Sequence, residues 1–309
     1  MANNIGIISA DVLRGIRAII RRWAASCGRN IAAEVALCFY QRPQPSAGSE
    51  EVHMLVSSRT WHAGLLAAVG FEHHCGRRWK FVIHDDGTVP QAAIDRMRSV
   101  LPDVRFVPRT EADSRAKEFL LDHPKCLEHR AKHNLFLKFF DFSAFAECER
   151  FIVLDSDAIF FRRPNEILEW ADSHADTCLY NEDSKEKYCI PRAQILESIG
   201  VTMWPRFNSG LVLMPRAAVD LDWAERLLET FEKNAHHPQF FEQTLYGLMA
   251  SVWNRGGALP STYEISWGYF RKRGAICRHY VGDFKHDLLY IEAAPLLMVS
   301  VLKGLLVSK

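Results

Sequence analysis

Short apolar runs alternate with helix-like segments through the first half of this 309-residue chain. Strand and helix in turn, the predicted segments are 52–57, 61–69, 80–84, 90–100, 104–107, about 129–146 and 150–154. This order predicts an α/β fold, in which a mostly parallel central sheet carries helices on both faces. Ligands of such sheets bind beyond the carboxyl ends of the strands. The residues that follow Leu154 are therefore expected at the functional edge of the sheet.

The second half is less regular and yields fewer predicted elements. They are a strand at 208–214, helices at 217–235 and 240–252, a late strand at 275–281 and a short apolar helix at 295–307. We expect this last helix to dock on the domain, with membrane contact as the alternative. The resulting division is an N-terminal helix and linker at 1–50, one domain at 51–290 and a helical tail at 291–309.

The N-terminal segment predicts an amphipathic helix. Its apolar residues recur on one stripe (Leu13, Ile16, Ile20, Trp23, Cys27), and Arg14, Arg17 and Arg21 lie off that stripe. A linker at 41–50, rich in proline and serine, follows. The helix either packs on its own domain or lies on an anionic membrane surface, and a transit peptide is a third interpretation.

Composition excludes several classes of protein. The formal net charge of +1 argues against a nucleic-acid partner bound mainly by bulk charge. The longest stretches without a charged residue, 60–71 and 243–254, are too short to span a membrane. Arginines interrupt the apolar N-terminal stretch, so export is not expected. The eight cysteines form no C-x-x-C pair, which indicates buried thiols in a reducing compartment. We expect a cytoplasmic protein, with peripheral contact at the inner membrane face as an option.

Two aspartates follow the most apolar predicted strand. Asp155 and Asp157 stand two residues apart, directly after the run 151–154. Carboxylates crowded at a strand end repel each other, and a divalent cation bound through their oxygens neutralises them. A pair of turn-capping aspartates is the structural alternative. The buried strand before the pair, and Arg162-Arg163-Pro164 after it, favour a functional site.

Four segments, in order, resemble one enzyme family. The run RFIVLDSDAIFFRRP at 150–164 resembles the Asp-x-Asp segment of nucleotide-sugar glycosyltransferases of the GT-A (Rossmann-like) fold. Phe207-Asn208-Ser209-Gly210 resembles the F-N-S-G strand of glycosyltransferase family 8, the glycogenin and bacterial galactosyltransferase group. Glu242-Gln243 resembles its Asp-Gln pair, with glutamate in place of aspartate. The run HYVGDFK at 279–285 fits its H-x-x-G-x-x-K pattern. The resemblance covers about residues 52–287.

The resemblance implies a metal-dependent hexosyltransferase with a UDP-linked donor and retention of anomeric configuration. Asp155, Asp157 and His279 would bind Mn²⁺ or Mg²⁺, which withdraws charge from the departing diphosphate. Donor-binding roles fall to Ser58, Lys138, Asp155, Ser156, Asp157, Ser209, Gly282 and Lys285. Catalytic roles fall to Asn208, Glu242, Gln243 and Lys285. The acceptor, whether glycan, lipid or protein, is not readable from the sequence.

Two other functions use parts of the same pattern. In a phosphatase of the haloacid dehalogenase type, Asp155 would be the nucleophile and Asp157 the acid/base, with Asp283 and Asp287 binding Mg²⁺. That class leaves the F-N-S-G segment without a role and usually carries its first motif near the start of the chain. The second alternative is a non-catalytic GT-A-like module at a membrane surface.

Overall fold

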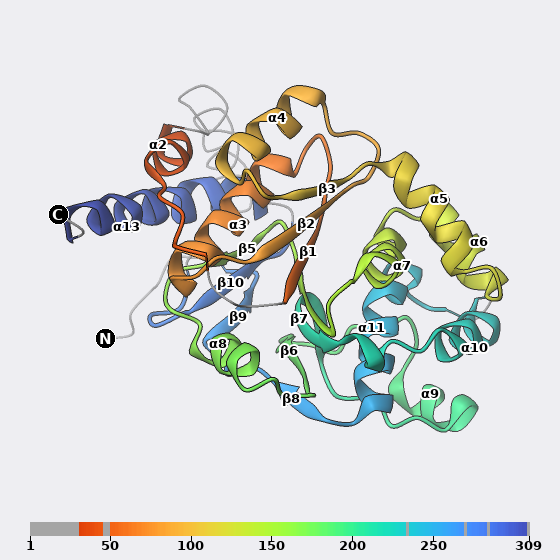
Figure 1. Cartoon of the computed structure of the whole chain (residues 1–309). Helices are drawn as coiled ribbons and strands as arrows, with labels where there is room; N and C mark the ends of the chain where they lie inside the picture. Colours follow the sequence, from red (N-terminus) through yellow and green to blue (C-terminus); the bar gives the residue numbers. More distant parts are fainter. Residues whose placement is uncertain (1–30, 46–49, 233–234, 269–270, 283–284, 308–309) are drawn as a thin grey trace, which may run out of the picture.

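The computed structural model describes residues 31–45, 50–232, 235–268, 271–282 and 285–307. Its main sheet has seven strands in the order β3-β2-β1-β4-β7-β6-β8 (Figure 1). These strands are β1 (Glu51–Val56), β2 (Lys80–Asp85), β3 (Arg105–Val107), β4 (Arg150–Leu154), β6 (Cys178–Glu182), β7 (Phe207–Pro215) and β8 (Gly256–Ala258). Strands β1 to β4 run parallel, and β7 runs antiparallel to both of its neighbours, β4 and β6. The predicted α/β fold with a mostly parallel sheet is confirmed.

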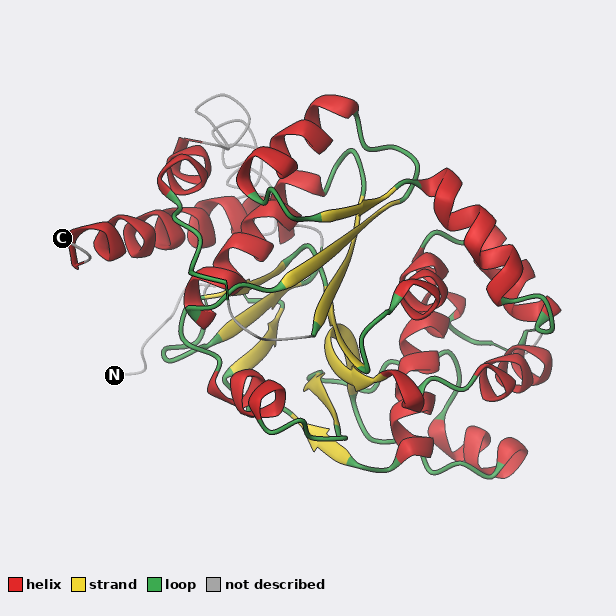
Figure 2. Ribbon diagram, viewed as in Figure 1, coloured by secondary structure: helices red, strands yellow, loops and turns green. Residues whose placement is uncertain are grey.

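Helices cover both faces of this sheet (Figure 2). In β4, Ile152 and Leu154 belong to a core shared with α3, whereas Phe151 and Val153 belong to a core shared with α7 and α11. Both faces of the strand are buried, which explains its unbroken apolar sequence. The helices are α2 (Ile31–Phe39), α3 (Trp61–Cys75), α4 (Gln91–Val100), α5 (Arg109–Phe119), α6 (Pro124–Lys132), α7 (Leu135–Phe145), α8 (Asn165–Asp172), α9 (Arg192–Ile199), α10 (Leu221–Phe231), α11 (Phe241–Trp253), α12 (Lys285–Leu288) and α13 (Ala294–Val307).

The last predicted strand lies in a second, three-stranded sheet. It consists of β5 (Ala158–Phe160), β10 (Cys277–Tyr280) and β9 (Tyr263–Ser266), with β10 in the centre. Strand β5 starts one residue after Asp157, and β10 pairs antiparallel with it so that His279 lies opposite Ala158. This pairing carries a histidine from near the end of the chain to the Asp-x-Asp turn.

Two predicted helices differ from those observed. The segment 129–146 is two helices, α6 and α7, which are separated at His133 and Asn134. The segment 217–235 begins instead with a short 3₁₀ turn, Arg216–Ala218, and α10 starts at Leu221. The later start has a local cause, because the Asp220 carboxylate accepts hydrogen bonds from the backbone N–H groups of Asp222 and Trp223. An aspartate N-cap of this kind fixes the first turn of a helix.

The two ends of the described chain pack together. Helix α13 lies against α2, and Leu297 and Val301 are buried with Ala33 and Ala36 in one core. The predicted helix at 13–27 lies outside the described residues. The run Leu289–Leu306 is long and apolar enough to cross a membrane by length and composition. Only 28% of it is buried in the protein. Glu292 and Lys303 interrupt this run, so it does not stand out in the sequence as a long stretch without charged residues.

Candidate active site

Three ligand-type side chains meet at the carboxyl end of β4. His279 Nε2 lies 3.2 Å from Asp157 Oδ1 and 3.5 Å from Asp155 Oδ2. Their ligand atoms all lie within 4.8 Å of one another. Ligands of one octahedral ion are separated by at most about 4.2 Å, twice a metal–ligand distance of about 2.1 Å. Small side-chain adjustments therefore suffice to bind an ion, and two carboxylates with an imidazole suit Mn²⁺ or Mg²⁺ better than Ca²⁺.

Backbone hydrogen bonds hold this cluster in place. The N–H of Asp155 donates to the carbonyl oxygen of Gly210 on β7 over 2.8 Å. The N–H of Ala158 closes the turn by donating to the Asp155 carbonyl over 3.0 Å, and the N–H of Tyr280 donates to the Asp157 carbonyl over 2.9 Å. The Asp-x-Asp turn is thus hydrogen-bonded to β7 of the main sheet and to β10 of the second sheet, which carries His279. This places the three ligands on rigid elements, as a preorganised site requires.

A buried lysine lies beside the carboxylates. Lys138 on α7 places its Nζ 2.8 Å from Asp155 Oδ1, 3.3 Å from Glu242 Oε1 and 3.3 Å from Ser209 Oγ. Burial alone would lower the pKa of Lys138, but the negative charges of Asp155 and Glu242 outweigh it and raise that pKa to about 12. The ammonium therefore stays charged. Asp155 and Glu242 share this one ammonium and Asp157 lies beside them, so the site keeps negative charge for a further cation to neutralise.

Glu242 lies at the start of α11 and faces the same space. Its Oε2 accepts a hydrogen bond of 2.9 Å from Ser209 Oγ. Burial raises the pKa of the Glu242 carboxyl, and the charge on Asp155 adds to this, while Lys138 and Ser209 oppose it. The carboxyl group is thus fixed in position by a hydroxyl and an ammonium.

Asn208 and Gln243 lie behind the histidine and are both buried. Asn208 Oδ1 is 3.1 Å from His279 Nδ1, and Asn208 Nδ2 donates to Gln243 Oε1 over 3.2 Å. Gln243 Nε2 in turn donates to the carbonyl oxygen of Lys187 over 2.6 Å. The strand β7 and the helix α11 therefore bring the F-N-S-G and Glu-Gln segments together, although they are separate in sequence.

A cavity of about 310 Å³ opens over these residues. The predicted residues Lys138, Asp155, Ser156, Asp157, Asn208, Ser209, Glu242, Gln243 and His279 all line it. At its other end lie Ser57, Thr60 and Asp86, from the ends of β1 and β2. Ser58 is exposed, and its backbone N–H donates to Thr88 Oγ1 instead. Of the two serines that follow β1, Ser57 lines the cavity, and the predicted Ser58 is not among the lining residues.

The segment after His279 is described in part. Gly282 has φ +90°, and a Cβ there would lie 2.9 Å from the Trp267 ring, so both its conformation and its surroundings favour glycine. Lys285 begins α12. Its side chain, together with Asp283 and Phe284, lies outside the described part of the structure.

One residue near the site was not predicted from the sequence. Asp183 directly follows β6, is buried, and binds Lys187 Nζ at 2.9 Å and Asn208 Nδ2 at 3.4 Å. The run Asn181-Glu182-Asp183, which closes the strand, was the available signal. It was missed because β6 itself was not predicted.

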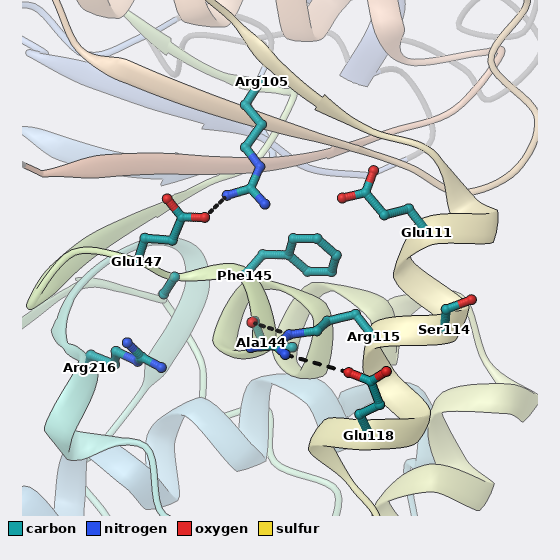
Figure 3. Close-up of a pocket in the computed structure, with 10 residues that line it drawn as sticks. Arg105, Glu111, Ser114, Arg115, Glu118, Ala144, Phe145, Glu147 and Arg216 are labelled. Carbon is teal, nitrogen blue, oxygen red and sulfur yellow. Dashed lines mark hydrogen bonds and ion pairs between the residues drawn. The ribbon is translucent and has the colours of Figure 1, made fainter.

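A larger hollow of about 510 Å³ lies at the opposite, amino-terminal edge of the parallel strands (Figure 3). Arg105 pairs there with Glu147, and Arg115 donates to the Ala144 carbonyl oxygen over 3.3 Å (Figure 3). Arg115 also lies 3.7 Å from Glu118. These arginines are matched by glutamates, so no unbalanced charge converges on this hollow as it does on the Asp155 cluster.

Comparison with known proteins establishes the fold. No protein-family model and no curated protein matches this sequence. Among solved structures, galactosyltransferase LgtC, in complex with donor and acceptor sugar analogs, superposes with a TM-score of 0.51 at 16% identity, covering 82% of this chain and 95% of that one. Mouse xyloside xylosyltransferase 1 gives 0.50 at 14% identity over 74% and 96% of the two chains. The glycosyltransferase GlyE of Streptococcus pneumoniae gives 0.51 at 10% identity over 84% and 64%. The GT-A fold expected from the motifs is confirmed.

Proposed function

We propose that this protein is a metal-dependent glycosyltransferase that transfers a sugar from a UDP-linked donor to an acceptor, with retention of anomeric configuration. The observation that carries the proposal is the convergence of Asp155, Asp157 and His279 at the carboxyl edge of a GT-A sheet. All three structures compared above belong to glycosyltransferases. The phosphatase alternative gives His279 no role, and the intact set of three ligand-type side chains argues against a non-catalytic module.

The metal site has two aspartates and a histidine as its ligands. Asp155, Asp157 and His279 would hold Mn²⁺ or Mg²⁺, which when bound acts as a Lewis acid on the diphosphate oxygens. Lys285 contributes a further positive charge to the departing phosphate, as the H-x-x-G-x-x-K pattern implies. Gly282 leaves room for the backbone to approach that phosphate closely.

The donor sugar lies over Lys138, Ser209 and Glu242. These residues line the cavity next to the metal ligands. Transfer builds positive charge at the anomeric carbon, and the Glu242 carboxylate, held by Ser209 and Lys138, stabilises that charge. The nucleoside end occupies the far part of the cavity, where Ser57, Thr60 and Asp86 offer hydrogen-bonding groups to the ribose and the base.

The acceptor enters from an adjoining hollow. A second cavity of about 470 Å³ shares Asn134, Leu135 and Glu242 with the donor cavity. Its remaining wall mixes polar side chains, such as His133 and Gln239, with Pro238. Such a lining suits a sugar, which has both hydroxyls and an apolar face. One structure of similar fold also contains an acceptor sugar analog.

We extend the proposal to a peripheral membrane contact. Helix α13 exposes Leu296, Val299 and Leu306 on the face that points away from α2, and Lys303 lies among them. An apolar ridge with a basic residue suits an anionic lipid surface. Sedimentation with anionic vesicles tests this. The double substitution Leu296→Ser/Leu306→Ser should abolish binding, whereas Val252→Ser, an exposed residue of α11, should not. Equal binding by both variants rules out the ridge.

A cytoplasmic location accompanies this assignment. The cysteines of the described chain, including Cys75, Cys126 and Cys178, are free thiols. Free, mostly buried thiols are typical of a reducing compartment.

A panel of nucleotide sugars tests the function directly. The protein is incubated with each donor and Mn²⁺, and release of the nucleoside diphosphate is measured. We expect hydrolysis of one UDP-sugar, lost with EDTA and in Asp157→Ala. Transfer is then sought with acceptor sugars. Phosphate release from simple phosphate esters, with no donor hydrolysed, would instead support the phosphatase alternative.

A further inference from the structure

The direction of one buried amide can be deduced from its neighbours. The backbone N–H of Gly210 lies 2.9 Å from Asn208 Oδ1, and a backbone N–H only donates. The atom that it faces must therefore be the amide oxygen. The other end of the amide agrees, because Asn208 Nδ2 faces the Asp183 carboxylate at 3.4 Å and Gln243 Oε1 at 3.2 Å, which are both acceptors. The usual ambiguity of an asparagine amide is thereby removed.

That direction determines which nitrogen of His279 is protonated. Asn208 Oδ1, an acceptor, lies 3.1 Å from His279 Nδ1. The hydrogen bond therefore requires a proton on Nδ1. Only Nε2 is left for a cation, and Nε2 is the atom that faces Asp155 and Asp157.

We propose that Asn208 is a positioning residue for the metal ligand, holding His279 in the Nδ1–H form with the Nε2 lone pair directed at the divalent ion. Gln243 acts one step further back, because its Nε2 is committed to the Lys187 carbonyl and its Oε1 therefore faces Asn208. The inference rests on the proposed function for the presence of the ion. It assigns Asn208 and Gln243 to orientation of His279, in place of the catalytic roles expected from the sequence.

Gly210 supports the same arrangement. A Cβ at this position would lie 2.3 Å from both Nδ1 and Cε1 of His279, so the ring lies directly against the glycine backbone. The N–H of Gly210 orients Asn208, and its carbonyl oxygen accepts from the N–H of Asp155. Two of the three metal ligands are thus oriented, directly or through Asn208, by one residue of β7. Outer-shell partners of this kind raise metal affinity by fixing the ring of the ligand.

The first test needs no substitution. The ¹⁵N shifts of the histidine rings are recorded for the full chain with Mg²⁺, and the His279→Gln variant identifies the signals of residue 279. We expect a protonated Nδ1 and an unprotonated Nε2. The opposite tautomer overturns the proposal.

The second test measures Mn²⁺ binding by electron paramagnetic resonance without any nucleotide. Asn208→Leu should weaken the affinity about 10–100-fold. Asn181→Leu, the same substitution at a buried asparagine of β6 whose amide has no hydrogen-bond partner in the described chain, should retain the affinity of the unmodified protein. If Asn208→Leu is folded by circular dichroism yet binds Mn²⁺ as tightly as the unmodified chain, the positioning role is wrong. If the unmodified chain binds no Mn²⁺, the proposed function itself fails.

Discussion

Lys138 Nζ lies 2.8 Å from Asp155 Oδ1, which makes a buried ammonium the nearest counter-charge of a proposed metal ligand. The same ammonium lies 3.3 Å from Glu242 Oε1. One cation therefore joins the Asp-x-Asp turn to the helix that carries Glu242. Both carboxylates therefore depend on Lys138 for their charge balance, and the stability of a Lys138 variant measures that dependence.

Replacing this lysine should destabilise the protein. Lys138→Met leaves the buried Glu242 carboxylate and the partly exposed Asp155 carboxylate without their partner, and loss of one partner from a buried pair such as Lys138 and Glu242 costs about 3–5 kcal/mol. We expect the free energy of unfolding in urea to fall by that amount and Mn²⁺ to restore part of it. Lys132→Met, whose side chain is half exposed beside Glu128, should cost much less, because solvent screens an exposed ion pair. Equal losses of unfolding free energy in the two variants would show that the ion pairs of Lys138 stabilise the protein no more than a surface pair does.

A methyl group at position 210 should damage the metal site. Gly210→Ala places its Cβ in the position of the His279 ring, so the ring must move away from Asp155 and Asp157. Overpacking of this kind costs about 1–3 kcal/mol of stability, and we expect a parallel loss of Mn²⁺ affinity. Gly257→Ala is the matched control, because no atom lies within 4 Å of the corresponding Cβ. Calorimetric titration with Mn²⁺ measures both variants, and full affinity in Gly210→Ala contradicts the observed packing.

Loss of Lys285 should separate leaving-group stabilisation from metal binding. If this lysine stabilises the departing diphosphate, Lys285→Ala should raise the activation barrier by about 2–4 kcal/mol, as removal of other oxyanion contacts does. The Mn²⁺ affinity in the absence of nucleotide should stay unchanged, because Lys285 is no metal ligand. Steady-state kcat and Mn²⁺ titration supply the two readouts. A normal kcat removes Lys285 from the mechanism without affecting the metal site.

Two buried histidines should make the protein sensitive to acid. His53 on β1 and His84 on β2 are buried side by side, with Nδ1 of His53 3.1 Å from Nε2 of His84. Burial lowers the pKa of each below 6.5, although Glu51 partly opposes this for His53. The folded protein keeps both neutral, whereas the unfolded chain takes up their protons below about pH 6.5. Stability is therefore complete above that pH and falls as the pH drops further, by up to about 1.4 kcal/mol per pH unit for each histidine.

Urea unfolding between pH 7 and pH 5 measures this slope. The double substitution His53→Leu/His84→Leu should make it shallower. Burial also lowers the pKa values of His62, His73, His74 and His129, which account for the slope that remains. A slope that the double variant retains in full must come from other groups.

The first half of the fold was predictable because its strands are buried on both faces. The prediction for β4 matches its observed bounds, that for β2 ends one residue early, and that for β1 is shifted by one residue at both ends. Prediction failed where pairing partners, rather than local sequence, determine the structure. Strand β5 has only three residues and exists because β10 pairs with it, and β8 is an exposed Gly-Gly-Ala run.

The candidate site also has a part that could be predicted from the sequence and a part that could not. Asp155, Asp157 and His279 were predicted from spacing and family resemblance, and the structure brings them together. The hydrogen bonds of Asn208 were not predictable, because they depend on a backbone N–H two residues further along and on Asp183 from an unpredicted strand. Residue types revealed which groups gather at the site, but only the tertiary structure shows which of them face one another.

The central claim is that the Asp155, Asp157 and His279 cluster binds a divalent ion that in turn binds a nucleoside diphosphate. Isothermal titration of the full chain with UDP, with Mn²⁺ and then with EDTA, tests it most directly. We predict binding that requires Mn²⁺ and that is lost in Asp157→Ala, with the circular dichroism spectrum unchanged. UDP binding of equal affinity in EDTA, or in Asp157→Ala, would contradict the claim.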